Sequence, residues 1–433
     1  MAEQHETALV PQIRFTGFTD PWEQRKLCEI AAFGGGHTPS MSDPDNYEGG
    51  NVLWVTSQDV KSYYLDGTTT QITEKGAKEL TLYPMGALVM VTRSGILRHT
   101  LPVAELCKPS TVNQDIRVIL PQEDKCCGKW LLQFFISRNK ELLLEFGKTG
   151  TTVESVDFSK MKDMILRMPS LSEQRQIGLY FARLDNLVTL HQRKYDKLCV
   201  LKKSMLDKMF PKGGSLYPEI RFAGFTDPWE QRKLSELVEI ERGGSPRPIE
   251  RYITDDPCGL NWVKIGDAPE LGRYITQTTE KIKPEGLAKT RQVYPGDLVL
   301  SNSMSFGRPY IMAIKGCIHD GWLLIRDAQK HFDPIFLCHM LGAPQMLNQY
   351  RMFAAGSTVN NLNKELVGKA IVSLPSKDEQ REIGIVLDRL DSLITLHQRK
   401  YDGCANPLFL ERRISCRKPS HQNRCSATTT PSG

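Results

Sequence analysis

Few side chains in this sequence have the types and spacing that catalysis or cofactor binding requires. Gly147-Lys148-Thr149 matches the end of a phosphate-binding loop, but such a loop also needs a glycine where Leu142 stands. The nine histidines form no zinc-site or metalloprotease motif. Gly34-Gly35-Gly36 and Gly243-Gly244 lack the spacing of a dinucleotide fingerprint, and we expect turns there. We therefore expect no catalytic residue, no metal and no cofactor in this chain.

Polar loops that carry arginine are better suited to binding than to catalysis. Arg93 lies in a glycine-bearing loop directly after the apolar run Ala87–Val91, and Arg308 lies in a similar loop after Leu298–Leu300. An arginine in such a loop can enter a DNA groove and donate two hydrogen bonds to guanine. The candidate DNA-binding residues are His37, Thr38, Ser57, Gln58, Thr92, Arg93, Ser94, Arg98, Asn113, Gln114, Arg242, Ser245, Lys264, Ser301, Asn302, Ser303, Arg308 and His319. For each residue alone, a solvated surface loop is the competing interpretation.

An internal repeat organises the chain. The segment Gly17–Leu27 recurs unchanged at Gly224–Leu234, 207 residues later. A second pair of similar segments, Ser172–Asp196 and Asp378–Asp402, is offset by 206 residues. Since the two offsets are nearly equal, the chain is a duplication with halves of almost the same length.

The interiors between these repeats, Cys28–Met168 and Ser235–Leu374, share a skeleton of apolar runs but little else. Short apolar runs separated by Gly, Pro, Asn and Asp predict strands. The predicted strands are 53–56, 87–91, 116–120, 298–300 and 322–325, and predicted helices cover 130–136 and 334–341. We expect one mixed α/β fold in each half, with surfaces rewritten for different targets.

The second pair of repeats predicts two long helices. Apolar residues at alternating spacings of four and three are typical of a helix that packs against another long helix. The predicted inter-helix packing residues are Ile177, Phe181, Leu184, Val188, His191, Tyr195, Leu198, Ile383, Leu387, Leu390, Ile394, His397 and Tyr401. We interpret the two histidines as residues that are packed or hydrogen-bonded between the helices, rather than catalytic ones. From Ser172 to about Phe210 the first helix would be roughly 58 Å long.

The predicted organisation has five parts. A first recognition domain covers 1–168, a spacer helix with its linker 169–214, a second recognition domain 215–374, a second and apparently truncated spacer helix 375–402, and a divergent tail 403–433. The helical period stops abruptly after Asp402, where the tail becomes polar and rich in cysteine. We expect the tail to be disordered and to contribute nothing to recognition.

Composition is that of a globular protein. The 433 residues include 40% hydrophobic and 24% charged residues, with a net charge of +6 that is compatible with nucleic acid but does not establish it. The sequence contains no apolar stretch of membrane-spanning length, and its first residues lack the regions of a signal peptide. The eleven cysteines are irregularly spaced, which favours reduced thiols in a cytoplasmic protein.

The arrangement resembles the specificity subunits of type I restriction–modification systems. The resemblance rests on the paired openings at Phe15 and Phe222 and on the paired LHQRKYD helices that follow Leu187 and Leu393, and it covers about residues 11–402. It implies an α+β fold with two target recognition domains and two antiparallel coiled-coil helices that act as a ruler. It also implies that each domain reads one half of a split site in double-stranded DNA.

The same resemblance implies that the chain is a non-catalytic recognition subunit. Its partners would be methylation subunits, in two copies, and restriction subunits, and their complex would be a site-specific deoxyribonuclease and adenine-specific methyltransferase. Three alternatives stay open from the residues alone. They are a self-contained methyltransferase or nuclease, a scaffold that binds proteins rather than DNA, and an inactive or phase-variable specificity allele.

Overall fold

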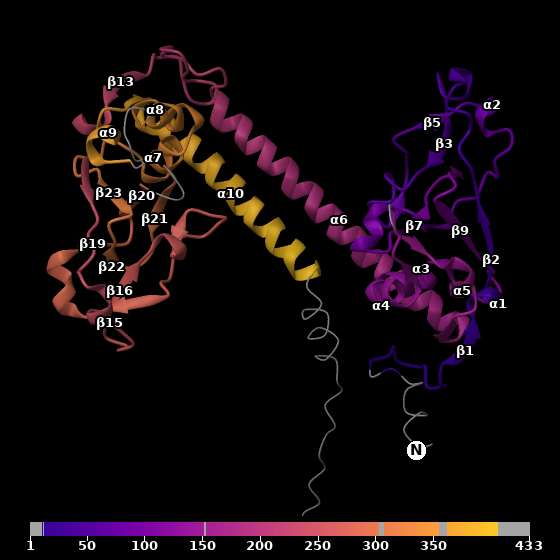
Figure 1. Cartoon of the computed structure of the whole chain (residues 1–433). Coiled ribbons are helices and arrows are strands. Elements are labelled where there is room, and N and C mark those ends of the chain that lie inside the picture. Colours follow the sequence, from indigo (N-terminus) through magenta and orange to yellow (C-terminus); the bar gives the residue numbers. More distant parts are fainter. Residues whose placement is uncertain (1–10, 12, 151–152, 303–306, 355–361, 406–433) are drawn as a thin grey trace, which may run out of the picture. The chain divides into compact units, whose positions relative to one another are not determined.

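The computed structural model describes residues 11, 13–150, 153–302, 307–354 and 362–405 (Figure 1). The predicted site residue Ser303 and residues 406–433 of the predicted tail lie outside this range. The boundary between two compact units falls inside one long helix, between Leu187 and Val188. Within the described residues, no helix combines the length and hydropathy that a membrane crossing needs.

The first module, residues 23–168, is built on a five-stranded sheet. Its order is β2 (Ala31–Gly35), β9 (Ile116–Pro121), β6 (Leu88–Val91), β7 (Val103–Leu106) and β4 (Tyr64–Leu65). A three-stranded sheet has the order β5 (Gln71–Ile72), β3 (Val52–Val55) and β8 (Thr111–Val112). Two further pairs are β1 (Glu23–Lys26) with β12 (Ile165–Met168), and β10 (Gly147–Lys148) with β11 (Ser155–Val156). The helices are α1 (Leu27–Ile30), α2 (Glu74–Ala77), α3 (Gly128–Ser137), α4 (Asn139–Phe146) and α5 (Phe158–Lys162).

The central strand β6 shows why this sheet forms. Its four residues are apolar and fully buried, since the sheet is covered on both faces. Leu88 and Met90 join one hydrophobic cluster with α3 and α4, whereas Val89 and Val91 face a second cluster. A strand with one solvated face would instead alternate apolar and polar residues.

The second module, residues 230–374, repeats this plan. Its main sheet has the order β14 (Glu239–Arg242), β23 (Trp322–Arg326), β20 (Leu298–Ser301), β21 (Pro309–Met312) and β17 (Tyr274–Ile275). The other sheet has the order β15 (Ile253–Thr254), β18 (Glu280–Ile282), β16 (Leu260–Val263), β22 (Gly316–Ile318) and β19 (Arg291–Val293). β13 (Glu230–Lys233) pairs with β24 (Ile371–Leu374), and the helices are α7 (Pro334–Leu341), α8 (Pro344–Ala354) and α9 (Lys364–Gly368).

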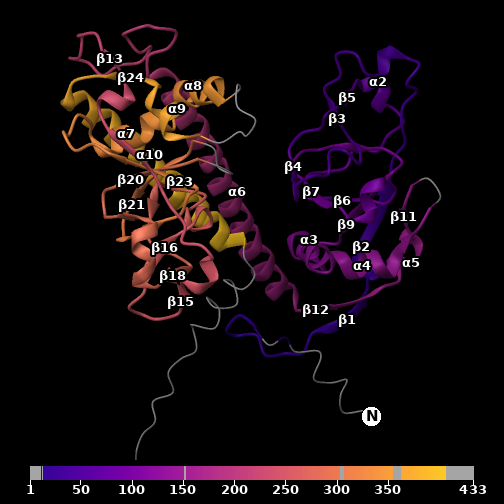
Figure 2. The same ribbon diagram turned by 60° about the vertical axis from the view of Figure 1, so that its left-hand side comes forward.

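Two long helices follow the modules, as predicted. α6 covers Leu171–Lys208, and α10 covers Lys377–Ala405, three residues beyond the expected end of the second helix. Within the second unit, α10 runs antiparallel to the later part of α6, because His191 contacts His397 while Lys202 contacts Asp391. The two helices lie side by side there (Figures 1 and 2).

The predicted packing positions on both helices are removed from solvent to different degrees. Ile383, Leu387, Leu390 and Ile394 of α10 are buried. The other described packing positions on both helices are partly buried. Three of the buried α10 residues belong to the core of the second module itself, and Ile177 packs against the core of the first. The apolar face of each helix therefore anchors a module as well as a neighbouring helix.

A paired arginine and glutamate hold the N-terminus of each long helix. Arg14 donates two hydrogen bonds of 2.7 Å to the carboxylate of Glu173 in the first turn of α6. Arg221 makes the same bidentate contact, at 2.7 and 2.8 Å, with Glu379 in the first turn of α10. Both glutamates are almost fully buried, and their position also suits the positive end of the helix dipole.

The expectation of turns at the two glycine runs is wrong, since no residue of either run lies in a turn. Gly34 and Gly35 are paired residues of β2, and a Cβ on the following Gly36 would overlap the carbonyl oxygen of Val112. Gly243, in the second run, directly follows β14, and a Cβ there would overlap the carbonyl oxygen of His319. These glycines permit two backbones to approach closely, which is the other role that a missing side chain serves.

Candidate nucleic-acid interface

In the first module, three chain segments meet at one end of the main sheet. The register pairs Gly35, the last residue of β2, with Arg117, and pairs Val91, the last residue of β6, with Ile116. The segments that follow β2 and β6 and the one that precedes β9 therefore lie together. They carry the predicted residues His37, Thr38, Thr92, Arg93, Asn113 and Gln114.

Some of these residues build the corner and others face solvent. The Thr38 hydroxyl donates to the side-chain oxygen of Gln114 at 2.5 Å, across 76 residues of sequence. Thr92 donates from its backbone and its hydroxyl to the carbonyl of Asp115, and the buried Asn113 is bonded to the same aspartate. Three predicted residues at this corner are exposed, namely His37, Arg93 and Gln114. We call this set of segments the first corner.

The predicted residues Ser57 and Gln58 lie in a loop beside the first corner. β3 runs parallel to β8, and the amide of Asn113 bonds the carbonyl of Val55 at the end of β3. Asp59 holds this loop by accepting four hydrogen bonds of 2.7–2.8 Å from the amides and hydroxyls of Thr56 and Thr69. Although burial opposes it, these bonds lower the pKa of the Asp59 carboxyl.

Ser94 and Arg98 have local structural partners. Ser94 caps the short 3-10 helix Gly95–Arg98, and the guanidinium of Arg98 bonds Glu154 at 2.6 Å. That hydrogen bond lowers the pKa of the Glu154 carboxyl. Since its charge is matched within the module, Arg98 is a weaker candidate for DNA contact than Arg93.

The second module has the same corner with other side chains. Arg242 is the last residue of β14, and Ser301 is the last residue of β20. Both lie opposite the start of β23, because Ser301 pairs with Trp322 and Arg242 pairs with Leu323. The amide of His319 bonds the carbonyl of Val263, as Asn113 bonds Val55 in the first module. The segments around Arg242, Asn302 and His319 form what we call the second corner.

Asp320 is the centre of the second corner. Its carboxylate accepts a 2.8 Å hydrogen bond from the hydroxyl of Ser245 and a 3.4 Å contact from Arg247. Its backbone carbonyl accepts from Arg242 and from the buried amide side chain of Asn302. Although burial opposes it, the Ser245 bond and the neighbouring Arg247 lower the pKa of the Asp320 carboxyl.

The remaining predicted residues of the second module make internal contacts. Lys264 forms an ion pair with Glu280. The ring of His319 is contacted by backbone amides on both sides, and burial lowers its pKa, so it is neutral at pH 7. Arg308 donates to the backbone carbonyl of Glu270, and the buried Ser301 accepts from the backbone amide of Arg308.

The residue that sequence reasoning missed is Arg247. Arg247 is exposed at the second corner, but a cationic side chain between two prolines carries no local signal of this position. Asp267 accepts from the amides of Lys264 and Thr279, the same bonding pattern that Asp59 makes in the first module. Each of these aspartates accepts from the backbone amide three residues before it, and this local spacing is shared by the two halves. Among the described residues, no group of three or more metal-ligating side chains is placed to hold an ion.

A family model described as the type I restriction modification DNA specificity domain matches residues 19–199 and again residues 226–403. The chain belongs to this family. The two matches coincide with the two halves of the duplication, so each half is one specificity domain with its long helix.

Individual specificity subunits are similar over different lengths. The specificity subunit of the type I restriction enzyme EcoR124I/EcoR124II from Escherichia coli is 29% identical over 187 residues, which are 40% of this chain and 46% of that protein. The match thus spans about half the length of that relative. The MjaVIII specificity subunit from Methanocaldococcus jannaschii is 22% identical over 403 residues, 88% of each chain.

A solved structure supports the architecture. The type I restriction–modification S subunit from M. genitalium matches with a TM-score of 0.61 and 11% identity, covering 94% of this chain and 97% of that one. At this identity the likeness concerns the fold alone. It confirms the predicted fold class of two similar mixed α/β domains with long helices.

Proposed function

We propose that this chain is the sequence-specific DNA-binding subunit of a type I restriction–modification complex. It recognises a bipartite site and directs adenine methylation or restriction by partner subunits, and it has no catalytic role itself. One observation carries the proposal: two modules of one fold hold the same corner with different side chains. Thr38 and Gln114 meet in the first corner where Ser245 and Asp320 meet in the second.

The chemistry of the corners supports base reading in the major groove. Exposed arginines such as Arg93 and Arg242 can donate paired hydrogen bonds to guanine, and the amide of Gln114 can pair with adenine. The residues beneath them, including Asn113 and Asn302, are buried and hydrogen-bonded to the backbone. The exposed groups are therefore held by a well-ordered part of the module. Specificity would come from these groups, and most of the affinity from cationic contacts to phosphate.

The long helices supply the ruler of the proposed function. α6 is continuous over 38 residues, a length of roughly 57 Å at 1.5 Å per residue. DNA rises about 3.4 Å per base pair, so a rigid spacer of fixed length selects a fixed gap between half-sites. The protein would act in the cytoplasm on chromosomal or invading duplex DNA.

A repeated apolar stripe is the proposed docking surface for two methylation subunits. The stripe residues are Leu179, Leu187 and Leu190 on α6, and Ile385, Leu393 and Leu396 on α10, and all six are between 43 and 50% exposed. Each α10 residue is offset by 206 from its α6 equivalent. All six side chains are partly exposed, so a partner can cover them.

Replacing Leu393 by aspartate is expected to weaken binding of one methylation subunit by at least about tenfold, since a charge would enter an apolar contact. Leu393 is 43% exposed, so the fold should be unaffected. The stoichiometry of the purified complex, measured by native mass spectrometry, is expected to fall from two methylation subunits toward one. Aspartate at Leu287, an exposed apolar residue far from both helices in sequence, is the matched control. Equal loss in both variants would contradict the docking assignment.

The decisive test of the function is methylation mapping in a genome that expresses this chain with its partners. A split adenine motif is the expected result. Replacing Arg93 by alanine should then relax one position of one half-site by roughly 5- to 150-fold, corresponding to about 1–3 kcal/mol, while the other half stays unchanged. Arg98, which is paired with Glu154, serves as the matched control. An unsplit motif, or relaxation of both halves by Arg93→Ala, would refute the proposal.

A further inference from the structure

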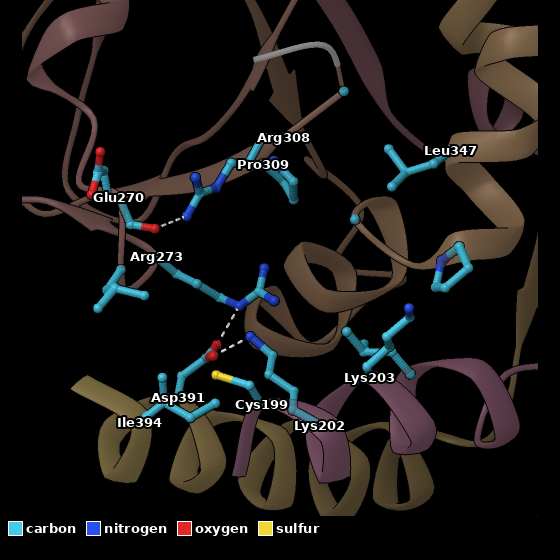
Figure 3. Close-up of a pocket in the computed structure, with 16 residues that line it drawn as sticks. Cys199, Lys202, Lys203, Glu270, Arg273, Arg308, Pro309, Leu347, Asp391 and Ile394 are labelled. Carbon is cyan, nitrogen blue, oxygen red and sulfur yellow. Dashed lines mark hydrogen bonds and ion pairs between the residues drawn. The ribbon is translucent and has the colours of Figure 1, made fainter. Parts of the chain in front are cut away.

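A cavity of about 670 Å³ lies in the second unit, where α6 and α10 approach the second module. Figure 3 shows the side chains of Lys202 and Lys203 rising from α6 toward this space, with Arg308 on its opposite side. The lining is unusual because its charged residues are mostly cations. They are Lys202, Lys203, Arg273 and Arg308 against Glu270 and Asp391.

The floor of the cavity holds two cations on one carboxylate. The guanidinium of Arg273 bonds Asp391 at 2.7 Å, and the ammonium of Lys202 bonds the other oxygen of the same group. The three side chains are only 11–17% exposed. Asp388 also faces these cations from α10, but it does not line the cavity. Burial and repulsion by Arg273 lower the pKa of the Lys202 ammonium, so the cations are crowded.

The other two cations add to this positive charge. Arg308 is held by the backbone carbonyl of Glu270 and lies 5.3 Å from the centre of the Tyr310 ring, and neither contact neutralises it. Lys203 is exposed at the rim of the cavity. An anion in this space would meet two largely buried cations, Lys202 and Arg273, and two exposed ones, Lys203 and Arg308.

At the equivalent place in the first module, the aspartate accepts hydrogen bonds from two uncharged side chains. Asp185 of α6, offset by 206 residues from Asp391, accepts hydrogen bonds from the hydroxyl of Tyr64 and the amide of Gln133. Tyr63, which precedes β4 there, stands where Arg273 precedes β17 in the second module. The arginine that bonds the aspartate in the second module is therefore not a requirement of the shared fold.

The cavity opens at the end of the sheet that carries the second corner. Arg308 directly precedes β21, whose first residue, Pro309, pairs with the end of β20. β17 runs parallel to β21, so Arg273 lies at the same end. In the strand order β14-β23-β20-β21-β17, the second corner occupies the first three strands and the cavity the last two.

We propose that this cavity binds a phosphate group of the DNA backbone next to the half-site that the second corner reads. The inference rests on the proposed function for the source of the phosphate. The shared chemistry is a phosphate held by lysine and arginine, which a free nucleotide would also supply. A backbone phosphate fixes position without reading sequence, and its contact is lost as salt rises.

The test uses the full chain assembled with its methylation subunits and the variant Lys203→Gln. Lys203 forms no part of the buried triad, so the fold should be kept. Binding of duplex DNA carrying the mapped bipartite site is measured over a range of salt concentrations. The variant is expected to bind about 3- to 10-fold more weakly and to lower the salt slope by about 0.9, equally for all second half-site sequences. Lys197→Gln, an exposed lysine of α6 outside the cavity, should behave as the parent.

Pyrophosphate and ATP are the probes that separate the two sources. If either protects the parent but not Lys203→Gln against thermal unfolding while the DNA salt slope is unchanged, the site serves a free ligand and the backbone assignment is overturned. If Lys203→Gln matches Lys197→Gln in both measurements, the phosphate site itself is overturned. If the parent binds no duplex DNA at all, the proposed function fails, and the pyrophosphate measurement alone then decides the site.

Discussion

Replacing Glu379 by alanine is expected to lower the free energy of unfolding of the second unit by about 3–5 kcal/mol, because it leaves a largely buried guanidinium without its counter-ion. Glu379 is 1% exposed and Arg221 14% exposed, and the two form a bidentate pair over a sequence separation of 158 residues. The pair joins the segment after α6 to the first turn of α10. Denaturant unfolding of the full chain, with hydrogen exchange to locate the loss in residues 215–402, measures the effect.

Two companion variants sharpen this result. Glu236→Ala removes an ion pair with Arg232 whose side chains are 46 and 36% exposed, and it should cost less than about 1 kcal/mol. The double replacement Arg221→Met with Glu379→Leu should recover part of the loss, since apolar groups of similar size remove both charges together. If Glu379→Ala were as mild as Glu236→Ala, the Arg221–Glu379 pair would have no structural importance.

The second large effect is expected for Gly243→Ala, which should abolish discrimination at one half-site. The new Cβ would overlap the carbonyl oxygen of His319, and backbone cannot move aside as a flexible side chain can. The segment that carries Asp320 would be pushed away from Ser245, at a cost of roughly 1–3 kcal/mol in stability. Methylation mapping is expected to show a relaxed second half-site beside an unchanged first one.

The matched control for this variant is Gly266→Ala. Gly266 has a negative φ and no neighbouring atom within 4 Å of an added Cβ, so alanine there should leave both half-sites intact. The equivalent substitution Gly36→Ala should relax the first half-site instead, through the carbonyl of Val112. Relaxation of the same half by Gly243→Ala and Gly36→Ala would contradict the assignment of one corner to each half-site.

Local sequence patterns predict a large part of this architecture. The four-and-three spacing from Ile177 onward predicted α6 to within two residues at each end. This is possible because helical periodicity depends only on residues three or four positions apart. The apolar runs predicted β6 and β20 for the same reason, and the duplication predicted that both modules share one fold. Glycine was ambiguous, since a missing side chain permits a turn or a close approach, and Gly34 proved to lie in a strand.

What the tertiary structure decided was which polar residues have partners within the chain. In the sequence, Arg93 and Arg98 were equally good candidates for DNA binding. The fold brings Glu154, 56 residues away, to Arg98 and leaves Arg93 exposed. Ser245 and Asp320 meet across 75 residues, and Arg273 and Asp391 across 118. Residues so distant are joined by strand register and helix packing, which no short stretch of sequence contains. The sequence by itself therefore determined the elements and their duplication, and the fold alone decided which polar groups stay exposed at the two corners.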